Sequence, residues 1–349
     1  MSDNSITKNK SLFVKGIAII LMINHHLFAF QDRIKKVSYI SIFKIEGIPI
    51  EYYFAEISKI CVSMFLFLGG YALFQVYKNG ISFKNILKRV YKLYLSYWTV
   101  FLVFILMGIL LGKINSDLKV ILLNFIGISS SLNPEWWFFE VYILLILCYP
   151  IIRKVIFKYS SLIVLSVSLF IYCIGTLAIV FSYSIGIVKY EFLFNVMNCQ
   201  FVFILGSLIA KEGIFDKIKI YINRKYQYGL IILISIVSLL VFPIKTLAYT
   251  IITPILIFSL AGLINNSKLI KILGKYSMNM WLIHSFFCYY YFQKLTFAPK
   301  YSILILIWII VLSLGSAILI EKLKIYIKQI IYITVNKLNY SRELNNNYK

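Results

Sequence analysis

The sequence predicts an all-α polytopic membrane protein with about ten transmembrane helices and with its N- and C-termini in the cytoplasm. Three observations lead to this prediction. Of the 349 residues, 61% are hydrophobic and only 14% are charged, and the mean hydropathy is +0.85. Soluble domains usually carry about 25% charged residues. The apolar residues also form repeated runs of roughly 20, the length that crosses a bilayer. Finally, the Lys and Arg residues lie between these runs with a bias toward one side.

The apolar runs place the spans in order, with connections too short for a sizeable soluble domain. We predict spans at residues 12–30, 54–77, 94–112, 136–152, 160–182, 193–210, 228–243, 247–264, 276–293 and 301–320. Residues 118–128 are apolar but too short to cross comfortably, so they are expected to lie at the interface or to re-enter. Residues 1–321 thus form a single transmembrane domain. Residues 322–349 form a basic cytoplasmic tail, for which an amphipathic helix followed by disordered residues is expected.

The basic residues orient the spans. With a cytoplasmic N-terminus, 24 of the 36 Lys and Arg residues fall in cytoplasmic segments, 10 in outer segments, and Lys15 and Lys59 inside spans. Cytoplasmic loops of membrane proteins carry this excess. A net charge of +23 would suggest nucleic-acid binding in a soluble protein. In a chain of this hydropathy, topology and anionic lipid headgroups explain the charge better, and an anionic ligand on the basic side is a further candidate.

Two ionisable side chains in the first span are candidates for chemistry, because polar groups inside a bilayer are costly. Lys15 lies near the inner end of the span, and His26 follows eleven residues later, about 16 Å along a helix. Neighbouring residues on a helix point about 100° apart, so only one of His25 and His26 is expected to face the bundle interior. A mid-span histidine is suited to act as a general base near neutral pH. The alternative is a structural hydrogen bond to a neighbouring helix.

Basic residues also precede the third span on the predicted cytoplasmic side. Lys88, Arg89 and Lys92 could bind the phosphates of a soluble ligand. From charge alone, ordinary positive-inside topology is the better explanation. In the second span, Gly69 and Gly70 are expected to allow close approach of a neighbouring helix.

Two later spans contribute further polar residues. Glu140 lies in the fourth span, shortly after an interfacial pair of tryptophans, and His284 lies in the ninth. Helical rise places Glu140 in the outer half of the bilayer and His284 close to its middle. Together with His26, and with Lys59 from the second span, these two residues form a polar cluster if their helices adjoin.

The order of these motifs resembles the acyltransferase type 3 family of bacterial membrane O-acyltransferases. Lys15, ten residues and His26 match its opening motif of a basic residue followed by the catalytic histidine. Arg89 and Lys92 match an Arg-x-x-Arg pair before the third span. The segments FLFLGGYAL, NPEWWFFEVYILLILCYP and YSMNMWLIHSFF resemble three further motifs, so the resemblance covers most of the chain. Lys15 and Lys92 stand where arginine is more usual, and a lysine lacks the bidentate fork.

This resemblance implies a stand-alone membrane O-acetyltransferase in the bacterial cytoplasmic membrane. The enzyme would transfer an acyl group, usually acetyl from cytoplasmic acetyl-CoA, to a hydroxyl of a cell-surface polysaccharide or glycolipid. In this family pattern His26 is the general base or, as an alternative, a transient acyl carrier. Glu140 and His284 would orient the base or the acceptor. Four cations would hold the donor: Lys15, Lys88, Arg89 and Lys92.

Two other readings fit parts of the sequence. A transporter or flippase of a glycan or lipid intermediate would share the spans and the intramembrane charges, but it does not explain the ordered series of motifs. A purely structural membrane component is disfavoured by the number of ionisable residues inside spans. The expected partners are acyl-CoA, the glycan acceptor and membrane lipids, without nucleic acid. The five cysteines show no metal-ligand spacing, so no metal is expected.

Overall fold

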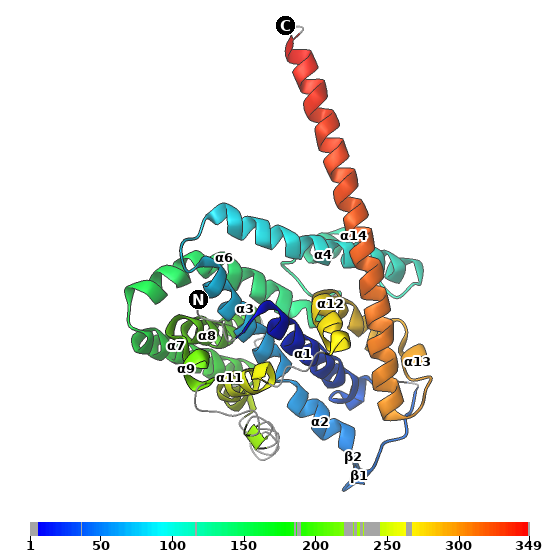
Figure 1. Ribbon diagram of the computed structural model, residues 1–349. Helices are drawn as coiled ribbons and strands as arrows, with labels where there is room; N and C mark the ends of the chain where they lie inside the picture. Colours follow the sequence, from blue (N-terminus) through cyan, green and yellow to red (C-terminus); the bar gives the residue numbers. More distant parts are fainter. Residues whose placement is uncertain are drawn as a thin grey trace.

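The computed structural model describes residues 6–347, except residues 36, 116, 185, 187–189, 220–225, 227–228, 231–232, 234–244 and 263–266. The protein is 82% helical, and the one sheet among the described residues is a hairpin of two-residue strands, so the predicted all-α class is confirmed. Helix α1 (Lys8–Phe28) begins at Thr7, whose side chain caps the helix. It lies in the middle of the bundle beside α12 (Lys268–Ser285) (Figure 1).

Two glycines let the backbones of α1 and α12 come into direct contact. A Cβ atom on Gly16 would lie 2.0 Å from the carbonyl oxygen of Ile270, and one on Gly274 would lie 1.8 Å from that of Leu12. Both distances are far below van der Waals contact. Because these contacts join the beginnings of both helices, α1 and α12 start side by side, and any added side chain would push them apart.

Replacing Gly274 with alanine is therefore expected to destabilise the protein by about 1–3 kcal/mol, because the added methyl group meets the backbone of α1 rather than a side chain that can move. Thermal unfolding in detergent would measure the change. Gly315→Ala is the matched control, since Gly315 also lies in a helix but has nothing within 4 Å of the added carbon. Equal unfolding temperatures for the two variants would contradict the role of Gly274.

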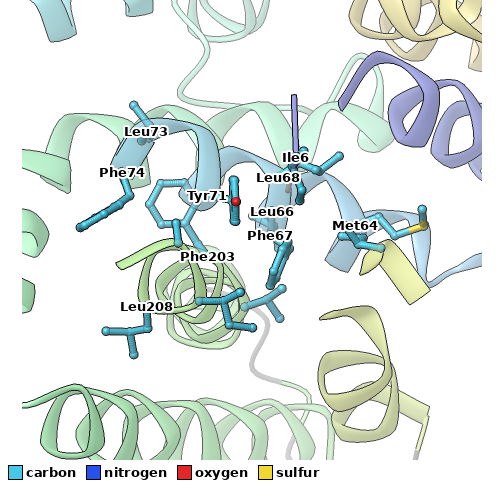
Figure 2. Packing of buried hydrophobic residues seen from close by; sticks show 14 of the residues in the cluster. Ile6, Met64, Leu66, Phe67, Leu68, Tyr71, Leu73, Phe74, Phe203 and Leu208 are labelled. Atoms are coloured by element: carbon cyan, nitrogen blue, oxygen red, sulfur yellow. The ribbon is translucent and has the colours of Figure 1, made fainter. Parts of the chain in front are cut away.

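The predicted second span, 54–77, is divided into α2 (Ile50–Ser58) and α3 (Cys61–Tyr77). Helix α3 packs closely against α8 (Glu191–Glu212), as Figure 2 shows for Phe203 and Leu208 beside the α3 side chains. A Cβ atom on Gly70 would lie 1.8 Å from the carbonyl oxygen of Phe203. The close approach predicted for this glycine is thus confirmed, and it fixes α3 as one wall of the bundle.

Helix α4 (Phe83–Leu110) is longer than the predicted span 94–112 and contains the basic segment that precedes it. The segment between α1 and α2 forms a 3-10 turn, η1 (Gln31–Arg33), and a hairpin of strands β1 (Lys44–Ile45) and β2 (Ile48–Pro49). The short apolar stretch predicted at 118–128 is α5 (Leu118–Phe125), which is too short to cross a membrane.

The remaining described elements follow the predicted order. They are η2 (Pro134–Trp136), α6 (Trp137–Lys158), α7 (Ser161–Ser184), α9 (Ile214–Lys219), α11 (Lys245–Gly262), the π-helical turn η4 (Phe286–Tyr290), α13 (Gln293–Thr296) and α14 (Ser302–Asn347). The predicted span at 228–243 lies almost entirely outside the described residues. Helix α14 continues the last predicted span without a break into the basic tail and extends beyond the bundle (Figure 1).

Six of the described helices are long and apolar enough to cross a membrane: α1, α2 together with α3, α4, α7, α8 and the first part of α14. Helices α6 and α12 lie in the same bundle, but each contains at least three charged residues, and α11 is an apolar helix of shorter length. The protein is therefore built as a helical membrane protein whose interior admits charged groups, and these groups lead to the candidate site.

Candidate active site

A cavity of about 170 Å³ lies between α1, α3, α4, α6 and α12. Its wall is mostly apolar and aromatic, with contributions from Met22, Phe65, Leu68, Trp137, Phe138, Tyr142 and Trp281. Three charged side chains and one histidine also line it: Lys15, Arg89, Glu135 and His26. An apolar cavity with a few convergent polar groups is the usual form of a ligand site.

One part of the cavity is basic. Lys15 of α1 and Arg89 of α4 both line it, although they are far apart in the sequence. Within the described part of the chain, neither cation forms an ion pair with a carboxylate. Two cations on one cavity wall can bind an anion together, and the guanidinium can hold two oxygens at once.

A glycine keeps the cavity open beside this basic end. Gly69 lines the cavity, and a Cβ atom there would lie 2.9 Å from the hydroxyl oxygen of Tyr142. The glycine therefore leaves room for the Tyr142 ring, which forms part of the same wall. The sequence predicted helix packing for both Gly69 and Gly70. In the structure Gly70 packs against α8, whereas Gly69 lies at the cavity beside Tyr142.

His26 and His284 meet at the other end of the cavity. Their ring centroids are 4.8 Å apart, which brings together two residues 258 positions apart on α1 and α12. The Nδ1 atom of His284 lies 2.6 Å from the carbonyl oxygen of Trp281. A carbonyl oxygen can only accept, so Nδ1 of His284 carries the proton and donates, which leaves Nε2 of the neutral ring as an acceptor.

Two ring nitrogens at this contact have no hydrogen-bond partner. They are Nε2 of His284 and Nδ1 of His26, and both are buried. Buried polar atoms without partners are uncommon in folded proteins and call for an explanation. A proton on Nδ1 of His26 would complement the acceptor nitrogen of His284, and it would make Nε2 of His26 the basic atom.

His25 has a different environment from His26. Its Nδ1 atom lies 2.8 Å from the carbonyl oxygen of Ala55, so the side chain links α1 to α2. His26 lines the cavity and His25 does not. The two adjacent histidines therefore point to different neighbours, as expected from helical geometry, and the ten-residue spacing from Lys15 selects the histidine in the cavity.

A carboxylate that the sequence reasoning passed over also lines this cavity. Glu135 of η2 is only 4% exposed, and its Oε1 atom lies 2.5 Å from a guanidinium nitrogen of Arg33. The hydroxyl of Tyr290, on the π-helical turn η4, donates to Oε2 at 2.7 Å. Partial burial lowers the pKa of Arg33, but the adjacent carboxylate of Glu135 outweighs it, so the pKa is raised above its usual value and the guanidinium stays charged.

The segment that carries Glu135 is anchored to α12 on both sides of this residue. The side-chain amide of Asn133 donates to the hydroxyl of Ser285 at 2.8 Å, and the indole N–H of Trp136 donates to the carbonyl of Leu282 at 3.0 Å. That carbonyl is available because the N–H of Phe286, at the helix end, bonds to residues 283 and 284 instead. These bonds place Glu135 next to the helix that carries His284.

Arg33 covers the histidine end of the cavity from the segment that follows α1. Its guanidinium carbon lies 4.4 Å from the ring centroid of Phe30 and 5.1 Å from that of Tyr289. Both rings in turn lie against His26, with centroid distances of 5.8 and 6.4 Å. Tyr289 also donates its hydroxyl to the backbone carbonyl of His26. Aromatic groups and one ion pair thus surround the histidine pair at this end.

Four residues proposed from the sequence do not line the cavity, and one of them, His284, touches His26 from outside the wall. Lys88 and Lys92 are exposed and lie one turn apart on the face of α4 that points away from it, whereas Arg89 and Leu93 face inward. Glu140 is on α6, and one of its carboxylate oxygens is buried without a partner, but the residue is not part of the cavity wall. The structure thus brings Lys15, His26 and Arg89 to one cavity, with His284 in contact behind His26.

No group of three or more metal-ligating side chains occurs among the described residues. In comparisons with known proteins, a family model described as an acyltransferase domain matches residues 13–322. No curated protein and no solved structure gives a significant match. The matched region contains every residue of the cavity and nearly nine-tenths of the chain. The chain therefore belongs to the acyltransferase type 3 family of membrane acyltransferases.

Proposed function

We propose that this membrane acyltransferase transfers an acetyl group from cytoplasmic acetyl-CoA to a hydroxyl of a cell-surface polysaccharide or glycolipid. The observation that carries the proposal is the cavity itself, which has two cations at one end, without an ion pair to any described carboxylate, and at the other end His26, backed by His284. Such a cavity suits a donor with an anionic head and a distant reactive group. Family membership favours acyl transfer over transport of a glycan or lipid.

The spacing of the cavity residues supports coenzyme A as the carrier of the acyl group. Lys15 and His26 lie on one uninterrupted helix, eleven residues apart, which corresponds to about 16 Å. A donor that reaches both needs a long, thin arm between its phosphates and its acyl group, as the pantetheine arm of coenzyme A provides. In the proposal, Lys15 and Arg89 bind the phosphates and the arm passes Gly69.

His26 is the general base of the proposed reaction. It takes the proton from the acceptor hydroxyl, whose oxygen attacks the carbonyl carbon of the thioester. The carbon–sulfur bond then breaks, and the leaving thiolate of coenzyme A takes up the proton from His26. In the proposal His284 supports this role: its ring lies against that of His26, and a hydrogen bond from Nδ1 of His26 to its acceptor nitrogen would fix the tautomer and stabilise the positive charge that His26 acquires.

Transfer of label from [¹⁴C]acetyl-CoA tests the proposal. The purified protein is reconstituted in phospholipid vesicles and incubated with envelope glycan extracted from a strain that lacks the gene. We expect alkali-labile label in the glycan and release of one free thiol per acetyl group, because an ester forms as the thioester is cleaved. A protein that neither binds nor consumes acetyl-CoA would refute the proposed donor and would favour transport instead.

A further inference from the structure

We infer that Glu135 binds the acceptor, and that the acceptor is a carbohydrate which presents a second hydroxyl beside the one that is acylated. This inference rests on the proposed function and adds the place and the chemistry of the acceptor site. In the structure, Glu135 is the one carboxylate that lines the cavity among the described residues, and the cavity also contains His26.

The carboxylate of Glu135 is held in place but keeps the capacity to bind a ligand. Arg33 donates to Oε1 and Tyr290 donates to Oε2, with distances of 2.5 and 2.7 Å. An ionised carboxylate offers about four lone-pair directions, so one direction remains on each oxygen. With a side-chain exposure of only 3%, a hydroxyl that reaches Glu135 must come through the cavity.

The charges of the cavity separate the donor from the acceptor. Lys15 and Arg89 attract phosphates at one end, whereas a carboxylate disfavours phosphates near His26. A hydroxyl group carries no charge and donates readily to a carboxylate, and such charge-assisted hydrogen bonds are strong. The histidine end therefore selects a ligand rich in hydroxyl groups rather than a second anion.

Two hydroxyl contacts define the class of acceptor. One hydroxyl must lie at His26 to lose its proton, and a second must donate to Glu135. A simple alcohol has one hydroxyl and cannot make both contacts, whereas a sugar ring carries neighbouring hydroxyls. The rings of Phe30 and Tyr289 lie outside the cavity wall and pack against His26, so they hold its imidazole in position for the first of these contacts.

Arg33 is a positioning residue in this site. It touches Glu135 through the ion pair and lies over Phe30 and Tyr289, but it does not line the cavity. Its guanidinium balances the charge of a carboxylate that would otherwise be buried alone, which is costly. Loss of Arg33 should therefore weaken the acceptor contact through Glu135 without changing the contacts of the donor at Lys15 and Arg89.

The test measures initial rates of label transfer from [¹⁴C]acetyl-CoA to the extracted envelope glycan, with each varied in turn. For Glu135→Gln, we expect the half-saturating glycan concentration to rise about tenfold or more, because a hydrogen bond to a charged group is lost. The half-saturating acetyl-CoA concentration should stay within about twofold. Arg33→Met should likewise raise the half-saturating glycan concentration and leave that of acetyl-CoA nearly unchanged. Arg33→Lys should restore part of the lost glycan affinity, since it keeps the charge.

Glu321→Gln is the matched control. Like Glu135, Glu321 accepts from one cation, Lys324, and from one neutral donor, here the side-chain amide of Asn279, but it lies on α14 outside the cavity wall. Saturation by glycan should not change in this variant. Binding of acetyl-CoA shows whether each variant is folded. If Glu135→Gln does not fold, Glu135→Asp takes its place. This variant shortens the side chain by one carbon and should also raise the half-saturating glycan concentration.

The outcomes separate the inference from the proposed function. Glu135 does not bind the acceptor if Glu135→Gln leaves the half-saturating glycan concentration unchanged, or if it raises the half-saturating concentrations of glycan and acetyl-CoA equally. The proposed function would stand in either case. If the wild-type protein binds acetyl-CoA but labels a simple alcohol as readily as the glycan, the second hydroxyl contact is refuted. If the wild-type protein transfers no label to any acceptor, the proposed function fails first.

Discussion

Replacing His26 with alanine is expected to lower the rate of acyl transfer by about a hundredfold to ten-thousandfold, the contribution that a positioned general base makes. His26 is the one histidine among the described residues of the cavity wall, so no neighbouring base can take its place there. Binding of acetyl-CoA should be retained, because Lys15 and Arg89 are untouched. Single-turnover transfer of label from acetyl-CoA, alongside the dissociation constant of the donor, measures both quantities.

His25→Gln serves as the control for this experiment. His25 is the adjacent histidine on the same helix, but it bonds to the backbone of Ala55 instead of lining the cavity. Its replacement should lower thermal stability and leave single-turnover transfer within a few-fold of the wild type. If His25→Gln abolishes transfer while His26→Ala retains it, the assignment of the two histidines is reversed and the mechanism is wrong.

Removing both cations of the basic end is expected to weaken acetyl-CoA binding by about a hundredfold or more. Each charge-assisted contact contributes about 1.5–3 kcal/mol, and Lys15→Met with Arg89→Met removes two of them. The wild-type affinity should also fall as salt is raised, because the contact is between charges. Titration of the reconstituted protein with acetyl-CoA at two salt concentrations measures both effects.

Lys154→Met with Lys158→Met removes the same net charge from exposed positions on α6. This pair should leave acetyl-CoA affinity nearly unchanged, so it distinguishes a local site from the general attraction of a basic protein for an anion. The acetyl-CoA affinity of Arg89→Lys should lie between that of the wild type and that of the Lys15→Met, Arg89→Met double variant, since lysine keeps the charge but lacks the bidentate guanidinium. An equal loss of affinity in both double variants would refute the phosphate site.

Much of the site could be predicted because it depends on single helices. Lys15 and His26 lie on one helix, so their spacing alone gives their separation along the cavity. The motif before the third span identified Arg89. The sequence did not separate Arg89 from its neighbours, because Lys88 and Lys92 differ from it only in the face of α4 on which they lie, and that face is set by packing.

The carboxylate at the site could not be predicted in the same way. Glu135 and Glu140 lie five residues apart around the same pair of tryptophans, and hydropathy favoured Glu140 because it is deeper in the span. The structure brings Glu135 to the cavity through contacts with Arg33 and Tyr290, which are 102 and 155 residues away. The sequence feature that could have pointed to Glu135 is the polar turn NPE at residues 133–135, which has more hydrogen-bonding groups than a helix start needs.

The fold shows the same division between local and distant information. Apolar runs predicted the helical class and most helix positions, since each run is a local property. They did not predict the break after α2 or the extension of α4 through its basic segment, because neither a short break inside an apolar run nor a helix in a basic segment changes the apolar pattern. The predicted number of spans rests on length and composition alone. Helices α6 and α12 line the cavity, but they carry too many charged residues to be recognised as spans by hydropathy.

The glycine contact between α1 and α12 also sets the relative position of the two histidines of the candidate site. His26 follows Gly16 by ten residues and His284 follows Gly274 by ten residues, so both histidines rise by about 15 Å from the same point of contact. A slip of one helix along the other by a single residue would shift one ring by about 1.5 Å and separate the pair. The alignment of the His26 and His284 rings is thus defined where two backbones touch, ten residues earlier on each helix, and substitutions there should slow the proposed reaction without altering any group that takes part in it.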